Sequence, residues 1–165
     1  MQEKWEKLVS VLLEILNIYK ELLGLGYQKR EALVERDLKR IEEVTKQEEN
    51  LIFQLAKLNG IREAVIQEIS ILHGLVDKKP TLSQISQLAD SEILYKLKNI
   101  EQEYNKMILE MTQLNEVNKK IVQQAMLIVN CTLSLISQSK ADPTYGSNQS
   151  APPVSHNRAL FDHKV

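Results

Sequence analysis

The sequence predicts an all-α protein, in which long helices pack antiparallel as an elongated hairpin or three-helix bundle with coiled-coil packing, followed by a flexible C-terminal tail. The 165 residues match the size of one domain, and only 5% are aromatic while Leu, Ile, Glu, Lys and Gln dominate, as in long helices. Apolar residues recur at alternating spacings of three and four through residues 1–140. That pattern stops at Ala141, so we expect a helical domain over 1–140 and a tail over 141–165.

The first helix is predicted over residues 2–35. Gly24 and Gly26 fall in its later turns, where each glycine weakens a helix by roughly 1 kcal/mol relative to alanine. The helix therefore either bends there or packs closely against a neighbour. Its apolar stripe consists of Trp5, Leu8, Leu12, Ile15, Tyr19 and Leu22.

The second helix is predicted over residues 37–75, with Asp37 as the N-cap because its carboxylate can accept hydrogen bonds from backbone N–H groups of the first turn. Two charged residues, Glu48 and Arg62, fall on core positions of this helix and indicate solvent-facing or paired gaps. Asn59–Gly60 is a turn signal, so the helix either continues through it or kinks there. The apolar frame consists of Ile41, Val44, Leu51, Leu55, Leu58, Val65, Ile69, Leu72 and Val76.

A short helix over 81–89 and a third long helix over 91–139 follow Pro80, which restricts the residue before it to extended geometry. Thr81 and Gln84 fit a capping box, in which each side chain satisfies a backbone N–H of the first turn. Asp90 or Ser91 is expected to cap the long helix. The frame of that helix consists of Ile93, Leu97, Ile100, Tyr104, Met107, Met111, Leu114, Ile121, Ala125 and Ile128.

The end of the third long helix is apolar over more than half of its circumference, with Leu127 on the side opposite to most of the other apolar residues. A surface helix normally buries a narrower stripe. Either this segment lies between other helices or at a dimer interface, or it is kept free for the amphipathic helix of a partner. The apolar residues are Ile121, Val122, Ala125, Met126, Ile128, Val129, Cys131, Leu133, Leu135 and Ile136.

Charge and hydropathy exclude several classes of partner. The 21 basic and 22 acidic residues are interspersed, so no broad field would attract nucleic acid. The N-terminal residues mix charges, unlike a secretory signal. The most apolar stretch, 125–136, is shorter than the about 20 residues that span a bilayer. We expect a cytoplasmic protein that neither binds nucleic acid nor inserts into a membrane.

Catalytic and metal-binding patterns are missing from the sequence. Di-iron bundles require Glu-x-x-His pairs, whereas Ser70, Pro153 and Leu160 precede the three histidines at that spacing. His73 is expected to cap a helix end or face solvent. The single cysteine, Cys131, lies in an apolar helix, where cysteine behaves as a small hydrophobe. We expect neither enzymatic activity nor a cofactor or metal.

Two segments resemble the FlgN-type flagellar export chaperones. The run 28–51, followed by Arg62, contains an R-x-A-L-x-x-x-D-L pattern that begins at Arg30. Pro143-Thr144-Tyr145-Gly146 and the later Ser155-His156-Asn157-Arg158 are similar to the tyrosine-glycine tail of that family and its basic end. The chain departs from the family pattern in Ala151–Pro153 and in Leu160-Phe161-Asp162.

The resemblance implies a cytoplasmic chaperone of type III flagellar export. Such a chaperone binds the C-terminal helices of the hook-filament junction proteins FlgK and FlgL, prevents their premature association, and delivers them to the export gate component FlhA. Tyr145 and Gly146 would then dock on the gate. The client would bind the third-helix surface formed by Leu114, Ile121, Val122, Met126 and Val129.

One alternative is a structural coiled-coil protein that only oligomerises. Helices with short hinges can close within one chain or exchange between chains. The sequence is therefore also compatible with a homodimer.

Overall fold

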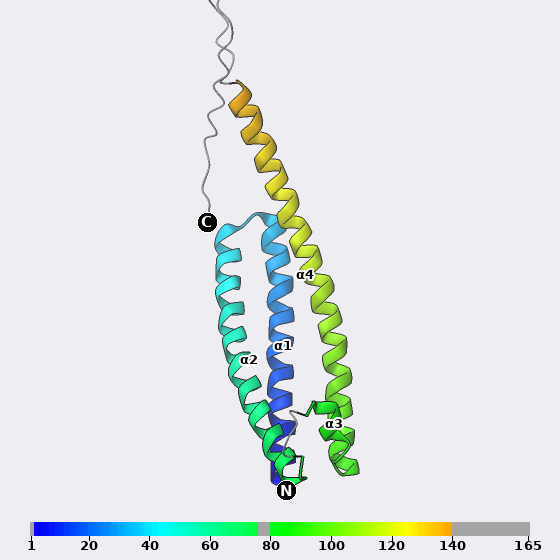
Figure 1. Cartoon of the computed structure of the whole chain (residues 1–165). Helices are drawn as coiled ribbons and strands as arrows, with labels where there is room; N and C mark the ends of the chain where they lie inside the picture. The colour runs from blue at the N-terminus through cyan, green and yellow to red at the C-terminus, as the bar shows by residue number, and fades with distance from the viewer. Residues whose placement is uncertain (1, 76–79, 140–165) are drawn as a thin grey trace, which may run out of the picture. The chain divides into compact units, whose positions relative to one another are not determined.

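The computed structural model describes residues 2–75 and 80–139, and the chain forms no strand within them (Figure 1). Three helices are long: α1 (Gln2–Glu35), α2 (Leu38–Leu72) and α4 (Ser91–Ser139). A short helix, α3 (Leu82–Ser86), lies between α2 and α4 in the sequence. The predicted all-α class, with several long helices packed together, is confirmed.

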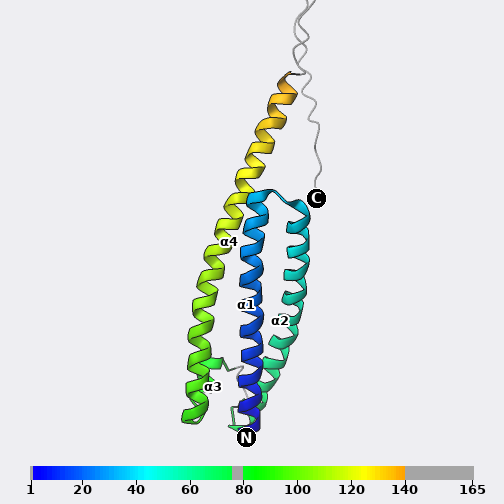
Figure 2. The ribbon, with the colours of Figure 1, turned by 180° about the vertical axis from the view of Figure 1, so that it is seen from behind.

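The chain divides into two units between Leu127 and Ile128, a point inside α4. In the first unit α1 lies between α2 and α4, as both views show (Figures 1 and 2). Helix α2 runs antiparallel to α1, and α4 runs in the same direction as α1. The described part of the second unit is the remainder of α4, residues 128–139.

The core of the first unit contains residues from all four helices. Leu8 of α1 and Ile85 of α3 are completely buried in it, and burial of such a side chain contributes about 1.5–3 kcal/mol. On the surface of the unit an ion pair joins Lys4 of α1 to Glu68 of α2. The short helix α3 thus helps to close the core through Ile85. The buried core residues are Trp5, Leu8, Leu12, Val65, Ile66, Ile69, Ile85, Ile93, Leu97 and Ile100.

Helix α1 ends in a Schellman motif with a non-glycine residue in the left-handed conformation. Arg36 has φ 59°. Its N–H donates to the carbonyl of Leu33 at 3.3 Å, and the N–H of Asp37 donates to the carbonyl of Ala32 at 3.0 Å. These two bonds satisfy carbonyls that the last turn leaves unpaired. The chain therefore stops α1 at Glu35 and reverses within two residues.

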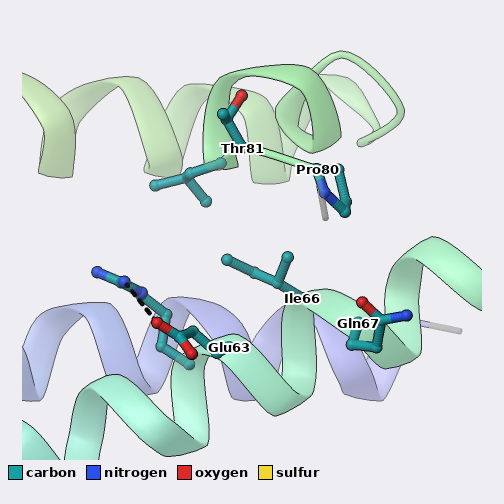
Figure 3. A pocket seen from close by; sticks show the side chains of 7 residues that line it. Glu63, Ile66, Gln67, Pro80 and Thr81 are labelled. Carbon is teal, nitrogen blue, oxygen red and sulfur yellow. Dashed lines mark ion pairs between the residues drawn. The ribbon is translucent and has the colours of Figure 1, made fainter. Parts of the chain in front are cut away.

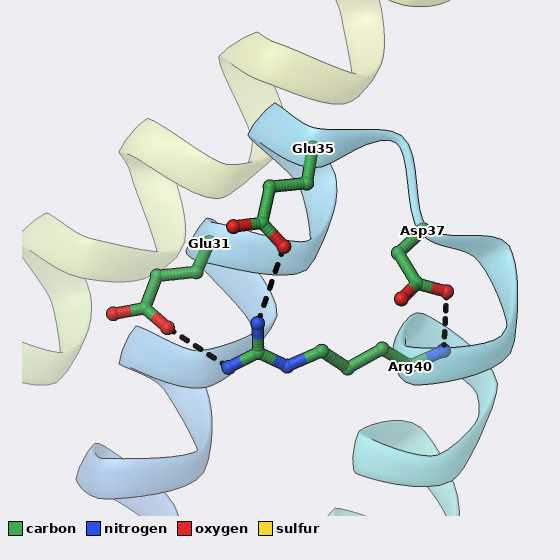
Figure 4. Close-up of polar contacts among 4 residues, drawn as sticks. All are labelled: Glu31, Glu35, Asp37 and Arg40. Carbon is green, nitrogen blue, oxygen red and sulfur yellow. Dashed lines mark hydrogen bonds and ion pairs between the residues drawn. The ribbon is translucent and has the colours of Figure 1, made fainter.

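Side chains reinforce this reversal (Figure 4). The Asp37 carboxylate accepts from the backbone N–H of Arg40 at 3.1 Å and caps α2. The Arg40 guanidinium lies between two carboxylates of α1, 2.9 Å from Glu31 and 3.3 Å from Glu35. Exposed pairs of this kind contribute at most about 1 kcal/mol each, so the caps matter more than the ion pairs.

Helix α2 ends at Leu72, three residues before the predicted limit at residue 75. Gly74 takes a left-handed conformation with φ 74°, and the N–H of Leu75 donates to the carbonyl of Ser70 at 3.0 Å. This is a second Schellman motif, here with the glycine that such a position favours. Helix α2 continues without interruption through Asn59–Gly60.

Polar side chains cap the first turns of the next two helices, α3 and α4. Thr81 and Gln84 form the capping box of α3, with the Thr81 hydroxyl accepting from the Gln84 N–H at 3.3 Å. Helix α3 ends at Ser86, and turns rather than helix follow it to Ala89. The Asp90 carboxylate accepts from the N–H of Ile93 at 2.8 Å and so caps α4.

Gly26 of α1 lies directly against side chains of α4. A Cβ atom on this residue would lie 2.8 Å from Cδ2 of Leu114. The side-chain amide of Asn118, which is buried, donates to the carbonyl of Gly26 at 3.1 Å. A residue larger than glycine would have to displace the end of the Leu114 side chain, so Gly26 is a site of close packing and Gly24, which is exposed, is not.

Tyrosines occupy the same interface. The rings of Tyr19 and Tyr104 meet edge to face with centroids 5.1 Å apart, and their hydroxyls are 3.4 Å apart. Burial, together with this hydrogen bond, raises the pKa of Tyr19 to about 12. The Tyr27 hydroxyl donates to the Glu110 carboxylate at 2.7 Å, and this bond raises the pKa of Tyr27. Both tyrosines thus stay neutral at physiological pH.

Replacing the two glycines of α1 separately tests the close packing. Gly24→Ala should stabilise the protein by about 0.5–1 kcal/mol, because alanine favours the helix and the position is open. Gly26→Ala should lose that gain, because the new methyl group must displace Leu114 and overpacking costs about 1–3 kcal/mol. Urea denaturation of both variants measures the difference. Equal stabilisation by the two substitutions would rule out the tight contact.

Arg36→Gly should raise the free energy of unfolding by about 0.5–1 kcal/mol, because a residue with a Cβ atom pays about 1–2 kcal/mol in the left-handed region. Arg36→Ala is the matched control, since it removes the same charge but keeps the Cβ atom, and it should give no gain. Thermal unfolding of both variants provides the comparison. Stabilisation by alanine equal to that by glycine would refute the backbone explanation.

Candidate functional site

Helix α1 ends before α4 does, and this difference creates an uncovered surface. Tyr27 hydrogen-bonds to Glu110, 83 residues later, and Gly26 to Asn118, 92 residues later. Glu35 is the last residue of α1. Adding the same offsets of 83 and 92 residues to its number gives positions 118 and 127 of α4. Beyond these positions α1 has no residue left to pair with α4.

Burial changes at the same place along α4. The side chains of Met107, Leu114 and Asn118 are buried, Ile121 is half-buried, and every side chain from Val122 to Ser137 is exposed. Within the first unit Met126 is 59% exposed and Leu127 64%. Exposed apolar side chains are normal one at a time, but a contiguous group of them indicates a binding surface.

The last turns of α4 form the described part of the second unit and are equally apolar. Their exposed large side chains are Ile128, Val129, Leu133, Leu135 and Ile136, and the free thiol of Cys131 is also exposed. The sequence has no charged residue between Lys120 and Lys140. When a partner covers this segment, no ionised group of the segment has to lose its water, which lowers the free-energy cost of binding.

The hydroxyl groups of this segment are bonded within the helix. Thr132 donates to the carbonyl of Ile128 at 2.9 Å, Ser134 to that of Asn130 at 3.0 Å, and Ser137 to that of Ser134 at 2.8 Å. A satisfied hydroxyl can be buried without losing a hydrogen bond. These polar residues therefore do not oppose contact with an apolar partner.

By length and composition alone, α4 is also apolar enough to cross a membrane. An 18-residue window of it has mean hydropathy 1.3, and none of that window is buried. The window is longer than the apolar stretch 125–136 considered from the sequence. The same composition suits a surface that binds the apolar face of an amphipathic helix, as hydrophobic grooves in other proteins do.

The residues predicted to contact a client have different environments. Val122, Met126 and Val129 are exposed, and Ile121 is half-buried. Leu114 is only 5% exposed and packs against Gly26, so its side chain belongs to the interface between α1 and α4. Tyr145 and Gly146, predicted to dock on an export gate, lie outside the described residues.

The two charged core positions of α2 have different partners. Glu48 accepts a hydrogen bond from Lys29 of α1 at 2.7 Å in a partly buried pair. Arg62 has one ion pair among the described residues, 3.9 Å from Glu63, and its buried Nε has no hydrogen-bond partner. Glu48 is thus a paired charge, as predicted, whereas the pairing of Arg62 is incomplete.

Arg62 lines a cavity of about 390 Å³ between α2 and the start of α3. Glu63, Ile66 and Gln67 form one wall, and Pro80 and Thr81 form the other (Figure 3). Its lining offers one guanidinium, one carboxylate and two neutral polar groups, with no histidine or cysteine. The residues that the structure describes contain no cluster of three potential metal ligands.

His73 lies at the C-terminal end of α2. Its Nδ1 is 2.9 Å from the carbonyl oxygen of Ile69, and its ring meets that of Trp5 edge to face with centroids 6.2 Å apart. The histidine therefore completes the end of the helix and packs against the core, in the capping role expected for it.

Comparison with protein families gives a match over most of the chain. The protein-family model described as FlgN protein matches residues 1–153. Neither curated proteins nor solved structures gave a match. The matched range includes every residue that the structure describes. It contains the run 28–51 and the Tyr145–Gly146 motif on which the resemblance was based, whereas Ser155–Arg158 lies beyond it. The chain therefore belongs to the FlgN family of flagellar export chaperones.

Proposed function

We propose that this chaperone holds the C-terminal helices of hook-filament junction proteins of the FlgK and FlgL type until they are exported. The supporting observation is the exposed, charge-free end of α4, which begins where α1 has no further residues to pair with it. Membership of the FlgN family supports a role in flagellar export, and the junction proteins are the clients that the resemblance implies. Val122, Met126 and Val129 are the proposed client contacts, with Ile121 at the edge of the surface.

Binding would act as a reversible mask. A terminal helix with an apolar face self-associates unless that face is covered, and a second apolar helix covers it without any covalent step. The client segment has to become ordered when it binds, and the cost of this ordering keeps the affinity moderate. A moderate affinity allows release at the export gate.

Delivery is proposed to depend on the tail. In this proposal Tyr145 and Gly146 dock on a gate component of the FlhA type, in the cytoplasm, while α4 holds the client. Client capture and delivery would then use neighbouring parts of the same chain, because the motif follows the end of α4 by only a few residues.

A second candidate function is supported by the same surface. Exposed apolar residues on α4 could join copies of the chain as a structural coiled coil without any role in export. Light scattering of the purified protein distinguishes the two: a stable dimer or tetramer that does not bind client supports the structural role, and a monomer argues against it.

Replacing Val122 and Val129 together by glutamine should weaken binding of a junction-protein C-terminal peptide by about tenfold or more, because each buried side chain contributes about 1.5 kcal/mol. Phe53→Gln is the matched control: it removes an exposed apolar side chain from α2, and it should leave affinity unchanged. Calorimetry gives the dissociation constants, and circular dichroism checks the helix content. Equal affinities for all three proteins would exclude α4 as the client site.

Tyr145→Ala should leave client binding intact but weaken association with the export gate component. The matched control is Tyr95→Ala, which removes an exposed tyrosine from the first turns of α4 and should affect neither interaction. Pull-down with the isolated gate component and calorimetry with the client peptide measure the two separately. Loss of both interactions in Tyr145→Ala would contradict a division of labour between helix and tail.

A further inference from the structure

Arg62 of α2 is a charged side chain whose hydrogen-bonding capacity is not used within the described part of the chain. A guanidinium carries five N–H donors. The contact with Glu63, marked by the dashed line in Figure 3, is 3.9 Å long and so exceeds hydrogen-bond length. The buried Nε has no partner among the described residues. Arg40, by contrast, lies 2.9 Å from Glu31 and has a second carboxylate at 3.3 Å.

Two cavities meet at this side chain. Arg62 and Leu82 line both the cavity of about 390 Å³ between α2 and α3 and a second cavity of about 240 Å³. The second cavity is also lined by Leu12 of α1 and by Ile100 and Asn105 of α4. The residues that line both cavities belong to the first unit. A ligand in either cavity would therefore contact the Arg62 side chain.

The charges around Arg62 leave its guanidinium incompletely neutralised. Glu63 is 76% exposed, and Glu101, which lines the second cavity, is exposed and forms no ion pair with Arg62. Burial raises the pKa of Tyr19, and the positive charge of Arg62 partly opposes this rise. The Arg62 charge thus acts on a side chain of α1 and not on solvent alone.

This combination selects the chemistry of a ligand. The planar guanidinium matches the geometry of a carboxylate or a phosphate. A phosphate carries more charge, and Arg62 is the only cationic side chain that lines either cavity. A carboxylate, with one negative charge, fits a single guanidinium. Ile66, Leu82 and Ile100 add apolar contacts, and binding sites commonly combine a few polar groups with an apolar lining of this kind.

We propose that Arg62 and the two cavities form a binding site for a carboxylate carried on an apolar body. Its source is an acidic side chain beside apolar residues in a bound protein segment, or a free small carboxylate of the same chemistry. The guanidinium donates to both carboxylate oxygens, and Leu82 contacts the apolar body. The site goes beyond the proposed chaperone function and is separate from the proposed client contacts. Along α4, Tyr104 precedes Ile121 by 17 positions, or about 25 Å.

Titration of full-length, ¹⁵N-labelled protein tests the chemistry of the site. Sodium hexanoate supplies a carboxylate on an apolar body, hexanamide supplies the body without the charge, and sodium acetate supplies the charge without the body. The Nε–H resonance of Arg62 is assigned by its loss in Arg62→Met. At constant ionic strength, hexanoate should shift this resonance saturably, with a dissociation constant at least about tenfold lower than those of the two controls.

A peptide distinguishes the two sources of the carboxylate. An end-capped helical peptide of roughly 15 residues carries one Glu between two Leu residues on the same face, at spacings of four. Its counterpart has Gln in place of Glu. Binding of the Glu peptide at least about tenfold tighter than that of hexanoate, and lost in the Gln peptide, assigns the site to a protein segment. Saturable binding of hexanoate without such a gain assigns it to a small carboxylate.

Variants separate binding from stability. Arg62→Met should weaken hexanoate binding at least about tenfold, with the backbone amide of Leu82 as the reporter. It should not lower the urea midpoint, because an apolar side chain leaves no unpaired donor. Arg40→Met is the matched control, since it removes the same charge from a paired arginine, and it should bind hexanoate as the unmodified protein does. Arg62→Lys keeps the charge without the planar fork, and should also bind more weakly.

Four results would overturn the inference. Hexanoate and hexanamide could bind equally, or neither hexanoate nor the Glu peptide could bind. Arg62→Met and Arg62→Lys could both leave the affinity unchanged; the lysine variant decides this point if the methionine variant unfolds. Finally, the Nε–H resonance of the ligand-free protein could shift in Glu101→Gln or in Asp77→Asn, a position outside the described residues. Such a shift means that a carboxylate of the chain itself already occupies the guanidinium.

Discussion

The close approach of α1 and α4 at Gly26 determines where α4 is covered and where it is not. Because glycine lets Leu114 and Asn118 reach the backbone of α1, the two helices are held at one register. Asn118 contributes to this as a buried polar group with a single partner among the described residues, and its Oδ1 is unsatisfied. Buried polar residues in helical interfaces commonly fix register at a cost in stability.

The lengths of the helices then decide how much of α4 lies beside α1. The Schellman motif at Arg36 ends α1 at Glu35, and the Asp37 cap begins α2 immediately afterwards. Had α1 continued at the same offsets, its next residues would have paired with α4 from about position 119 onwards. A backbone event at one residue of α1 therefore bears on the exposure of a different helix.

Periodicity and capping chemistry were sufficient to predict most of the fold. The stripe from Trp5 to Leu22 marks α1, and Asp37, Thr81 with Gln84, and Asp90 cap the helices that follow them. These signals are local, because the residues that make each hydrogen bond lie within four positions in the sequence. The end of α1 was predictable only from the restart at Asp37, since Arg36 is not a residue that favours the left-handed conformation.

Contacts between distant segments could not be predicted in the same way. Leu114 and Ile121 occupy equivalent positions in the apolar frame of α4, yet Leu114 is buried against α1 and Ile121 is half-buried. Only the register between the helices separates these two positions, and that register depends on Gly26 and Asn118, 92 residues apart. Leu127, by contrast, could be recognised from the sequence as an apolar residue opposite the stripe, although the sequence alone does not say that it is exposed.

Amide hydrogen exchange along α4, with and without a junction-protein fragment, tests the central claim most directly. If the end of α4 is a binding surface, amides from Ile121 to Ser137 should exchange quickly in the free protein, where few buried contacts protect them. They should slow by orders of magnitude in the complex, while amides near Leu114 stay protected in both states. Strong protection of the end in the free monomer, or no change in the complex, would contradict the account.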